Sequence, residues 1–462
     1  MSKKDLYIDY NKYRKRRNHN KRPNIFRNVV IIIVLATILG LGAYYLAKEG
    51  YISLEFLSIA KEDIKEKAEI ESEEPKELDQ VVKESTQDNI EEENLNGFKD
   101  DLEEELESTE DSLQETVNSQ DNDKPSIKKD AIKVKGIYVT GPVAGSADRI
   151  NELAGLVNST ELNAMVIDVK NDSGEITYNM DHDLVDEIGA KVNYVTDMEQ
   201  LVEDLKEKDI YLIARLVAFK DPLLAEKKPE LCIKNTDGSL FRDKDGLGWV
   251  NPYNKDVWEY LIEISKKAVD IGFDEIQFDY IRFSTDPGMK NVDFGLEAED
   301  KSKTEIIIEF TEHVYQELSS YGAFVSADVY GAIIDSEIDQ EIVGQDYVEM
   351  SKHLDYICPM IYPSHYEEGS YEIEHPDLEP YKLILASLNK SKEVLSEIEE
   401  GEHVAIVRPW LQDFTAPWIS NYQKYGPGQI REQVEGVYDS GYEEWILWNG
   451  SNKYSEEGLL KE

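Results

Sequence analysis

The sequence holds little cysteine and little histidine, with two Cys and seven His in 462 residues. Cys232 and Cys358 cannot build a framework of several disulfides. The spacings CxxC and HExxH do not occur, so structural zinc and zinc-protease sites have no support. Cys358 lies in an apolar run with no evident base beside it, which favours a small buried side chain over a nucleophile. We therefore expect neither a metal nor a cofactor.

Positive charge is also scarce, and it is unevenly distributed. The chain has 50 Lys and Arg against 96 Asp and Glu, a formal net charge of −46. Residues 1–60 carry 11 basic and 4 acidic residues, whereas residues 61–130 carry 9 and 26, and residues 131–462 carry 30 and 66. A nucleic-acid-binding protein needs a basic face that displaces counterions from the phosphates. The acidic body therefore argues against a nucleic-acid partner.

One long apolar run follows the basic N-terminal region. Residues 28–47, NVVIIIVLATILGLGAYYLA, contain no charge, and a helix of this length spans roughly 30 Å, the hydrocarbon thickness of a bilayer. The preceding Lys and Arg predict that residues 1–27 stay in the cytoplasm and that the rest is exported. A cleaved signal peptide is the alternative, but no A-x-A-like site follows. We expect a single-pass anchor over residues 28–48 in the cell membrane.

The next region is too polar to fold by itself. Residues 61–130 contain a single aromatic residue, Phe98. Such a segment buries too little apolar surface to offset the entropy lost on ordering. We therefore expect a disordered acidic linker over residues 49–130, followed by one exported domain over residues 131–462.

Eight short apolar runs divide residues 131–462, and stretches of helical period lie between them. One such stretch places Met198, Val202 and Leu205 at i, i+4 and i+7. A β–α unit repeated eight times in about 320 residues is typical of a (β/α)8 or TIM barrel, an α/β fold. A doubly wound open sheet is the alternative, but YVTGPVAGS lacks the GxGxxG turn of that fold. The expected strands span residues 135–141, 164–170, 210–219, 274–283, 324–331, 356–363, 403–412 and 443–450.

Two aspartates are expected to point into the barrel. In DEIQFDYIRF (274–283), Ile276 and Phe278 share the face toward the helices, which turns Asp279 inward near the C-terminal end, where barrel active sites form. The same alternation turns Asp328 of SADVYG inward. An inward carboxylate is costly unless it is paired or used. Ion pairing is the alternative to a catalytic role, and the candidate partners are Lys170, Arg215, Arg282 and Arg408.

Other polar and aromatic residues lie near the ends of the expected strands. Asp168 is interpreted as a partner of Lys170 or Arg215 that orients the site. Flat aromatic rings stack on sugar faces, although ordinary packing is the alternative for many of them. The candidate substrate-binding residues are Asp168, Lys170, Arg215, Trp249, Tyr362, His365, Arg408, Trp410, Trp448 and Asn449.

Five motifs in order carry a specific resemblance: GFDEIQFDYIRF, SADVYG, ICPMIYPSHY, RPWLQDF and WILWNG. From about Gly136 to Tyr454 the chain resembles a bacterial family of glycosyl hydrolases first catalogued as a domain of unknown function. The family is similar to α-amylase-type barrels. The resemblance implies that Asp279 is the nucleophile and Asp328 the acid/base, with retention of configuration. Strand five offers Asp where α-amylases carry Glu, which departs from that pattern.

The expected function is therefore hydrolysis of a poly- or oligosaccharide at the C-terminal end of the barrel. The alternative is a non-catalytic protein that binds carbohydrate or cell wall on the same scaffold, because fold does not imply activity. Two carboxylates at catalytic separation distinguish the two functions.

Overall fold

The computed structural model describes residues 131–461. The expected cytoplasmic tail, membrane anchor and acidic linker lie outside the described residues, and so does Glu462. Within residues 131–461, no helix combines the length and the apolar character needed to cross a bilayer.

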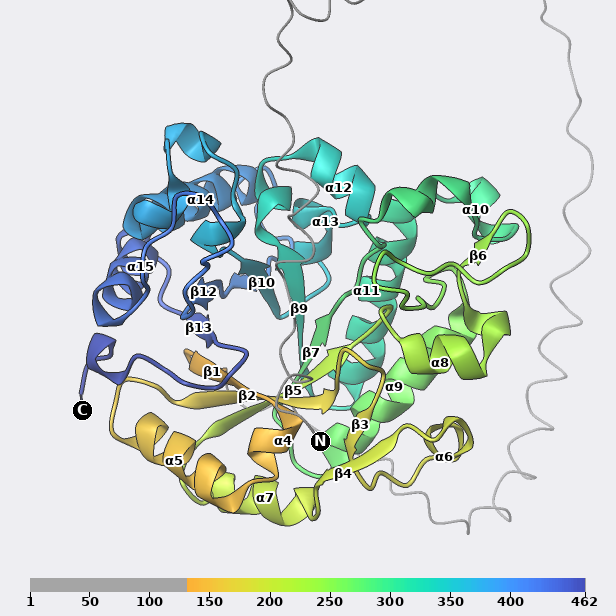
Figure 1. Cartoon of the computed structure of the whole chain (residues 1–462), viewed down its shortest axis with the longest axis horizontal. Coiled ribbons are helices and arrows are strands. Elements are labelled where there is room, and N and C mark those ends of the chain that lie inside the picture. The colour runs from red at the N-terminus through yellow and green to blue at the C-terminus, as the bar shows by residue number, and fades with distance from the viewer. Residues whose placement is uncertain (1–130, 462) are drawn as a thin grey trace, which may run out of the picture. The chain divides into compact units, whose positions relative to one another are not determined.

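Eight parallel strands form a closed barrel (Figure 1). Each strand pairs with the next along the chain, and β1 pairs with both β2 and β13, which closes the ring. All eight expected runs contain one of these strands, so the predicted barrel is confirmed. The barrel strands are β1 (Lys135–Val139), β2 (Ala164–Lys170), β5 (Tyr211–Val217), β7 (Glu275–Asp279), β9 (Phe324–Tyr330), β10 (Tyr356–Met360), β12 (Trp410–Gln412) and β13 (Trp445–Trp448).

Short strands extend or flank the barrel. β11 runs beside β10 and is separated from β12 by Arg408 and Pro409, because proline has no N–H to offer the ladder. β3 and β4 continue the sheet from β2, while β6 and β8 form a separate pair in the loops. Their bounds are β3 (Ile176–Tyr178), β4 (Lys191–Val195), β6 (Lys234–Asn235), β8 (Val292–Asp293) and β11 (Ile406–Val407).

Helices surround the strands on the outside (Figure 1). The long ones are α5 (Ala147–Asn158), α7 (Met198–Lys206), α9 (Lys255–Asp270), α11 (Lys303–Ser320), α14 (Pro380–Leu395) and α15 (Pro427–Asp439). The short ones are α4 (Gly141–Ala144), α6 (Asp183–Ile188), α8 (Pro222–Lys227), α10 (Glu297–Asp300), α12 (Glu337–Val343) and α13 (Tyr347–Ser351). Up to residue 461, β13 is followed by the 3-10 turn Glu456–Gly458 instead of an α-helix.

The sequence periodicity correctly identifies the buried helix faces. Met198, Val202 and Leu205 of α7 are all buried, as the i, i+4, i+7 spacing predicts. The strands have both faces covered, since Ile276 and Phe278 of β7 pack toward the helices while a second apolar cluster fills the barrel interior. That inner cluster includes Tyr138, Val166, Ile213, Tyr356, Cys358, Trp410 and Ile446.

Candidate active site

Asp279 is the last residue of β7 and faces the inside of the barrel, where 6% of its surface is exposed. The predicted strand was expected to continue to residue 283, but Tyr280 has a φ of 55° and ends it. A tyrosine in this left-handed region is strained, and such strain gathers at functional sites. The strained turn lets the Tyr280 backbone N–H donate to Asp279 Oδ1 at 2.6 Å.

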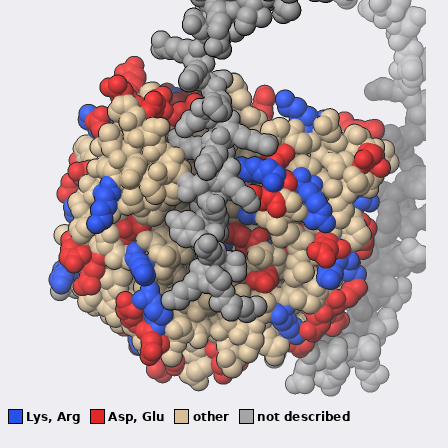
Figure 2. All heavy atoms as spheres, viewed as in Figure 1, with Lys and Arg blue, Asp and Glu red and all other residues tan. Residues whose placement is uncertain are grey.

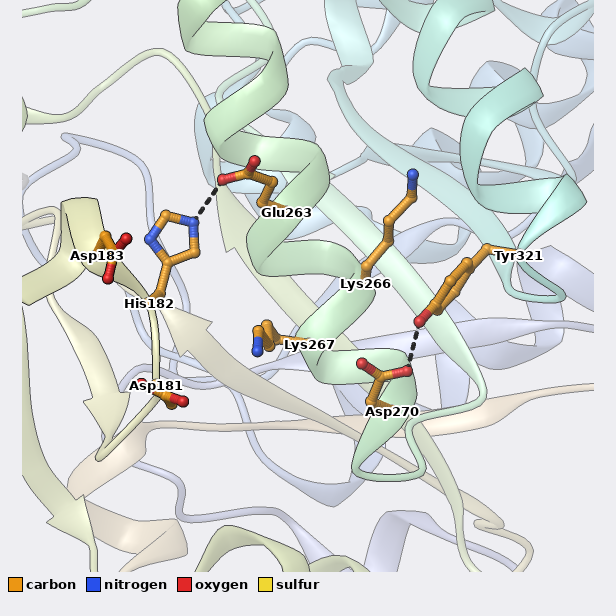
Figure 3. A pocket seen from close by; sticks show the side chains of 8 residues that line it. All are labelled: Asp181, His182, Asp183, Glu263, Lys266, Lys267, Asp270 and Tyr321. Carbon is orange, nitrogen blue, oxygen red and sulfur yellow. Dashed lines mark hydrogen bonds and ion pairs between the residues drawn. The ribbon is translucent and has the colours of Figure 1, made fainter. Parts of the chain in front are cut away.

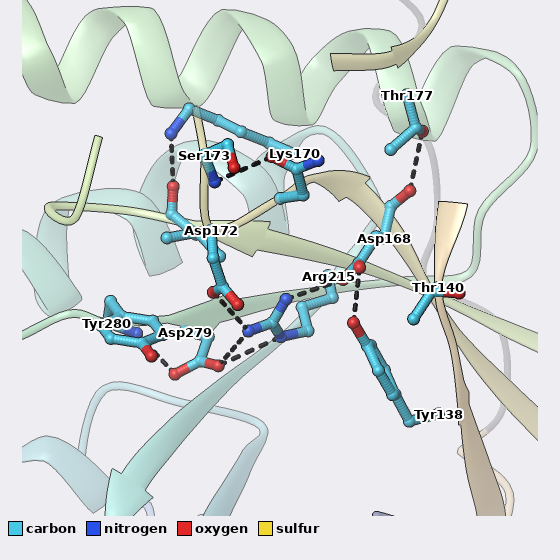
Figure 4. Close-up of polar contacts among 12 residues, drawn as sticks. Tyr138, Thr140, Asp168, Lys170, Asp172, Ser173, Thr177, Arg215, Asp279 and Tyr280 are labelled. Carbon is cyan, nitrogen blue, oxygen red and sulfur yellow. Dashed lines mark hydrogen bonds and ion pairs between the residues drawn. The ribbon is translucent and has the colours of Figure 1, made fainter. Parts of the chain in front are cut away.

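Arg215 of β5 connects three aspartates (Figure 4). Its Nε and Nη2 donate to Asp279 Oδ2 at 3.1 and 2.6 Å, and its Nη1 donates to Asp168 Oδ1 at 2.7 Å. Nη2 also reaches Asp172 Oδ1 at 3.2 Å. Burial alone would lower the pKa of Arg215, but the three carboxylates raise it well above its usual value. Arg215 therefore remains charged, and its guanidinium lies directly against the Asp279 carboxyl group.

Asp328 lies on the strand next to Asp279, at the same height. Phe278 of β7 is opposite Ala327 of β9, so the following pair in the register is Asp279 and Asp328. Trp410 donates its indole N–H to Asp328 Oδ1 at 2.6 Å. Burial, followed by the negative charge of Asp279, raises the pKa of Asp328 well above its usual range. The two aspartates thus have different environments, since Asp279 binds a cation whereas Asp328 is buried beside a carboxylate.

Asp168 of β2 completes the polar cluster. Its Oδ2 accepts a bond from the Tyr138 hydroxyl at 2.6 Å, and its backbone carbonyl accepts one from Thr177 (Figure 4). Burial raises the pKa of Asp168 to about 6, against the lowering effect of Arg215. Of its two expected partners, Asp168 therefore pairs with Arg215, whereas Lys170 pairs with Asp221.

An aromatic wall stands beside the aspartates. Trp448 stacks on Tyr138 with ring centroids 4.1 Å apart, and Trp410 meets Trp448 edge-on at 5.5 Å. The Arg215 guanidinium lies 5.5 Å from the Tyr138 ring and 5.6 Å from the Trp448 ring. Trp410 is only 1% exposed, so its main contact is the bond to Asp328.

A second aromatic group lies after β10 and β12. Tyr362 and the exposed His365 pack against Phe414, with ring centroids 5.8 and 6.1 Å from it. Phe414 in turn stacks with the half-buried Trp418 at 6.1 Å. Phe414 and Trp418 were not among the predicted residues, although Phe414 belongs to the motif RPWLQDF.

Three predicted residues are used elsewhere. Arg408 pairs with Glu275 and Glu444, each at 2.8 Å, so the expectation that it neutralises Asp279 or Asp328 is wrong. Its backbone position explains this, because residue 408 precedes Trp410 by two and therefore lies deeper in the barrel.

Lys170 and Asn449 bind groups in and around the loops that follow the strands. A β-bulge after Asp168 places Lys170 opposite Leu216, and its buried ammonium binds Asp221 at 2.8 Å and the Val217 carbonyl at 2.6 Å. Asn449 donates its side-chain amide to the carbonyls of Asp413 and Lys453.

Trp249 and Asp172 lie in loops above the strands. Trp249 meets Tyr280 edge-on at 6.0 Å and donates its indole N–H to Asp243. Asp172, which sequence reasoning missed, follows β2 by two residues in the turn NDSG. Only its position just past a strand end marks it, because turns have no periodicity to show which way a side chain points.

A separate pocket lies outside the barrel (Figure 3). His182 pairs there with Glu263 at 2.8 Å, and Tyr321 donates to Asp270 at 2.6 Å. Asp270 and Tyr321 lie at the C-terminal ends of α9 and α11, hence toward the end of the barrel opposite to Asp279. Across residues 131–461, no group of three or more His, Cys, Asp or Glu is arranged to hold a metal ion.

Charge on the surface is mixed. Figure 2 shows acidic and basic side chains of the described residues scattered around this face, without one large basic area.

Solved structures similar to the chain include a hypothetical protein from Ruminiclostridium thermocellum, with 44% identity over 42% of this chain and 97% of that one and a TM-score of 0.39. The PgaB (BpsB) glycoside hydrolase domain from Bordetella bronchiseptica is 14% identical over 69% and 94%, with a TM-score of 0.49. The α-galactosidase TtGalA from Thermus thermophilus is 11% identical over 72% and 62%, with a TM-score of 0.44. No curated protein matches the sequence.

The family comparison covers most of the barrel. Residues 136–454 match the model of the family described as "Putative glycosyl hydrolase domain", which is more than half of the chain. This range contains all eight barrel strands except the first residue of β1, and it includes Arg215, Asp279 and Asp328. The chain therefore belongs to this glycosyl hydrolase family, and its barrel is a glycosidase domain.

Proposed function

We propose that the chain hydrolyses a poly- or oligosaccharide with Asp279 as nucleophile or charge stabiliser and Asp328 as acid/base. The observation that carries the proposal is the contrast between their surroundings. Asp279 is bound by Arg215, whereas Asp328 is buried and lies beside the charge of Asp279. Glycosidic hydrolysis needs one ionised and one protonated carboxyl group at the scissile bond.

The hydrogen bonds leave each aspartate free for its step. A carboxylate has about four lone-pair sites, and Asp279 uses three of them on Arg215 and on the Tyr280 N–H. The remaining site faces the positive charge that develops at the anomeric carbon. Asp328 accepts the Trp410 indole at Oδ1, so its proton is placed on Oδ2, from which it passes to the departing glycosidic oxygen.

The strand register supports retention of configuration. Adjacent strands lie about 4.8 Å apart, and a carboxyl separation of about 5–5.5 Å belongs to retaining enzymes. Asp279 and Asp328 lie at equal height on adjacent strands, which favours the short separation. In the second half of the reaction, Asp328 would deprotonate the water that releases the sugar from Asp279.

Purified full-length chain tests the proposal against a panel of polysaccharides, with release of reducing ends as the readout. We expect turnover on at least one glycan and none from the double variant Asp279→Asn, Asp328→Asn. Glycan binding by both proteins without any turnover would instead support the carbohydrate-binding alternative.

We also propose that residues 28–48 anchor the protein in the cell membrane with the barrel outside the cytoplasm. The basic residues before the uncharged run and the acidic ones after it support this orientation. Protease added to intact, wall-stripped cells should remove the barrel. Survival of the barrel while an exported control is digested would contradict the orientation.

A further inference from the structure

Two buried cations beside the proposed catalytic pair form no ion pair with a carboxylate of the described residues. Within residues 131–461, the buried cationic side chains are Lys170, Arg215, Lys220, Arg282 and Arg408. Three of these five form ion pairs with Asp or Glu at 2.8 Å or less. In the described part of the chain, no carboxylate lies within ion-pair distance of Lys220 or Arg282, each of which is 8% exposed. We propose that Lys220 and Arg282 form a subsite for a negatively charged group on the glycan substrate.

Aromatic rings, not carboxylates, surround Arg282. Its guanidinium carbon lies 4.6 Å from the Tyr330 ring centroid, 4.8 Å from that of Tyr280 and 5.2 Å from that of Trp249. One of its five N–H donors is used on the Phe283 carbonyl at 2.9 Å. The rings keep the cation in place while donors remain for a ligand.

Lys220 approaches the same tyrosine. Its ammonium lies 4.6 Å from the Tyr280 ring centroid and 3.4 Å from the Tyr280 hydroxyl. Burial raises the pKa of Asp172, but the charges of Arg215 and, after it, of Lys220 lower it below its usual value. Lys220 and Asp172 nevertheless form no ion pair. Both cations therefore lie close to the Tyr280 ring, and we place the anion of the substrate beside this ring.

Lys220 and Arg282 differ from the other buried cations of the barrel, which all form ion pairs with carboxylates. A buried charge without a partner loses its hydration and is destabilising unless something compensates. The domain is rich in carboxylates, with 66 acidic against 30 basic residues after position 130, so an acidic partner would be easy to supply. A binding site for a substrate anion explains why these two cations have no ion-pair partner within the protein.

The position of the subsite connects it to the reaction. Tyr280 follows Asp279 directly, and Tyr330 follows Asp328 by two residues on β9. Figure 4 shows the Tyr280 ring beside the Asp279 carboxyl group. An anion held there belongs to a sugar next to the scissile bond. The inference rests on the proposed function and narrows the substrate class to a glycan that carries a carboxylate or a phosphate ester.

The test measures affinity in an Asp279→Asn background of the full-length chain, which removes turnover. Three probe sets separate the sources of the charge: uronate oligosaccharides with their carboxyl-reduced counterparts, phosphorylated oligosaccharides with their phosphatase-treated counterparts, and neutral glucan and chitin oligomers. We expect one acidic set to bind tightest and to lose about 10- to 100-fold in affinity when its charge is removed. This loss corresponds to the free energy of charge-assisted hydrogen bonds.

The variants then connect the affinity to the two cations. Arg282→Gln should lower the affinity for the acidic glycan to nearly the affinity for its neutral counterpart. The affinity for the neutral counterpart should not change. Arg282→Lys should restore part of the affinity for the acidic glycan. Lys255→Gln is the matched control, because Lys255 also lies over an aromatic ring, Trp258, but on the outer surface. Lys220→Gln repeats the test if Arg282→Gln lowers the melting temperature.

Three outcomes would overturn the inference: a neutral glycan as the tightest ligand, affinity indifferent to charge removal, or equal weakening of acidic and neutral forms by Arg282→Gln. If neutral glycans are cleaved and Asp279→Asn is inactive, the proposed function stands and only the anion subsite fails. If no glycan is bound or cleaved, both fail.

Discussion

Two arginines are buried inside the same barrel. A comparison of their surroundings distinguishes a structural ion-pair cluster from the candidate active site. At the base, Arg408 pairs with Glu275 and Glu444, and its guanidinium lies 3.7 Å from the Tyr356 ring centroid. Both partners are almost fully buried. At the mouth, Arg215 binds three aspartates, one of them partly open to solvent, and Asp328 lies beside them without a cation of its own. Arg408 thus lies between two carboxylates in a closed packing unit, whereas Arg215 has three aspartates bound to it and a fourth, Asp328, beside them.

Among the changes proposed here, removal of the Asp279 charge should have the largest effect, and this effect should be on turnover. Asp279→Asn keeps the shape but removes the negative charge that stabilises the anomeric carbon, so we expect turnover to fall by about 10⁴-fold or more. Initial rates and thermal melting measure activity and fold separately. The melting temperature should change little, since Arg215 retains Asp168 and Asp172. A large loss of stability would mean that Asp279 is a structural ion pair like those at the base.

The same type of change at the base should affect stability instead. Glu275→Gln removes one partner of a fully buried ion pair, which should lower the free energy of unfolding by about 3–5 kcal/mol. Urea unfolding of the variant measures this loss. Turnover per folded molecule should remain within a few-fold of the wild type. A stable but inactive variant would show that the base takes part in the reaction.

We expect Asp168 to make the free energy of unfolding depend on pH. Because the pKa of Asp168 is raised from 3.8 to about 6 in the fold, the native state binds more protons than the unfolded chain between these values. The contribution of Asp168 to the free energy of unfolding should therefore fall as pH rises from about 4 to 6, by up to about 3 kcal/mol. Asp168→Asn should flatten this slope in urea titrations at several pH values. An unchanged slope would refute the raised pKa.

The smallest effect is expected at the outer aromatic residues. Trp418 stacks with Phe414 beyond the strand ends, and truncation to Ala should weaken oligosaccharide binding by about 1 kcal/mol, roughly fivefold. Calorimetry in the Asp279→Asn background measures it. Trp258→Phe on the outside of the barrel is the control. If Trp418→Ala binds like its parent, these rings serve packing and not the sugar.

The direction of a strand side chain could be predicted where apolar and polar residues alternate along the strand. Ile276 and Phe278 mark one face of β7, so the inward direction of Asp279 followed from its neighbours. Alternation does not give the position of Lys170, because a β-bulge shifts the register by one residue and nothing in AMVIDVK signals it. The partner of Arg408 could not be predicted either, since Glu275 is 133 residues away and is chosen by the closing of the barrel.

The site also contains features that no periodicity reveals. Tyr280 looked like a strand residue, yet its positive φ turns its N–H back onto Asp279. Asp172 comes from a turn, and Phe414 and Trp418 come from the loop after β12. Side chains in loops are directed by contacts with distant segments, and a single sequence does not show those contacts.

The central claim is that Asp328 gives its proton to the leaving group, and the most direct test compares two leaving groups. Asp328→Asn should lower kcat by about 10²- to 10⁴-fold on a natural glycosidic bond, because an alkoxide leaves poorly without protonation. On an aryl glycoside with an acidic phenol as leaving group, the first chemical step should be almost unaffected. Burst kinetics on both substrates give the answer. A similar loss of the first step on both, or near-native rates on the natural bond, would contradict the division of roles between Asp279 and Asp328.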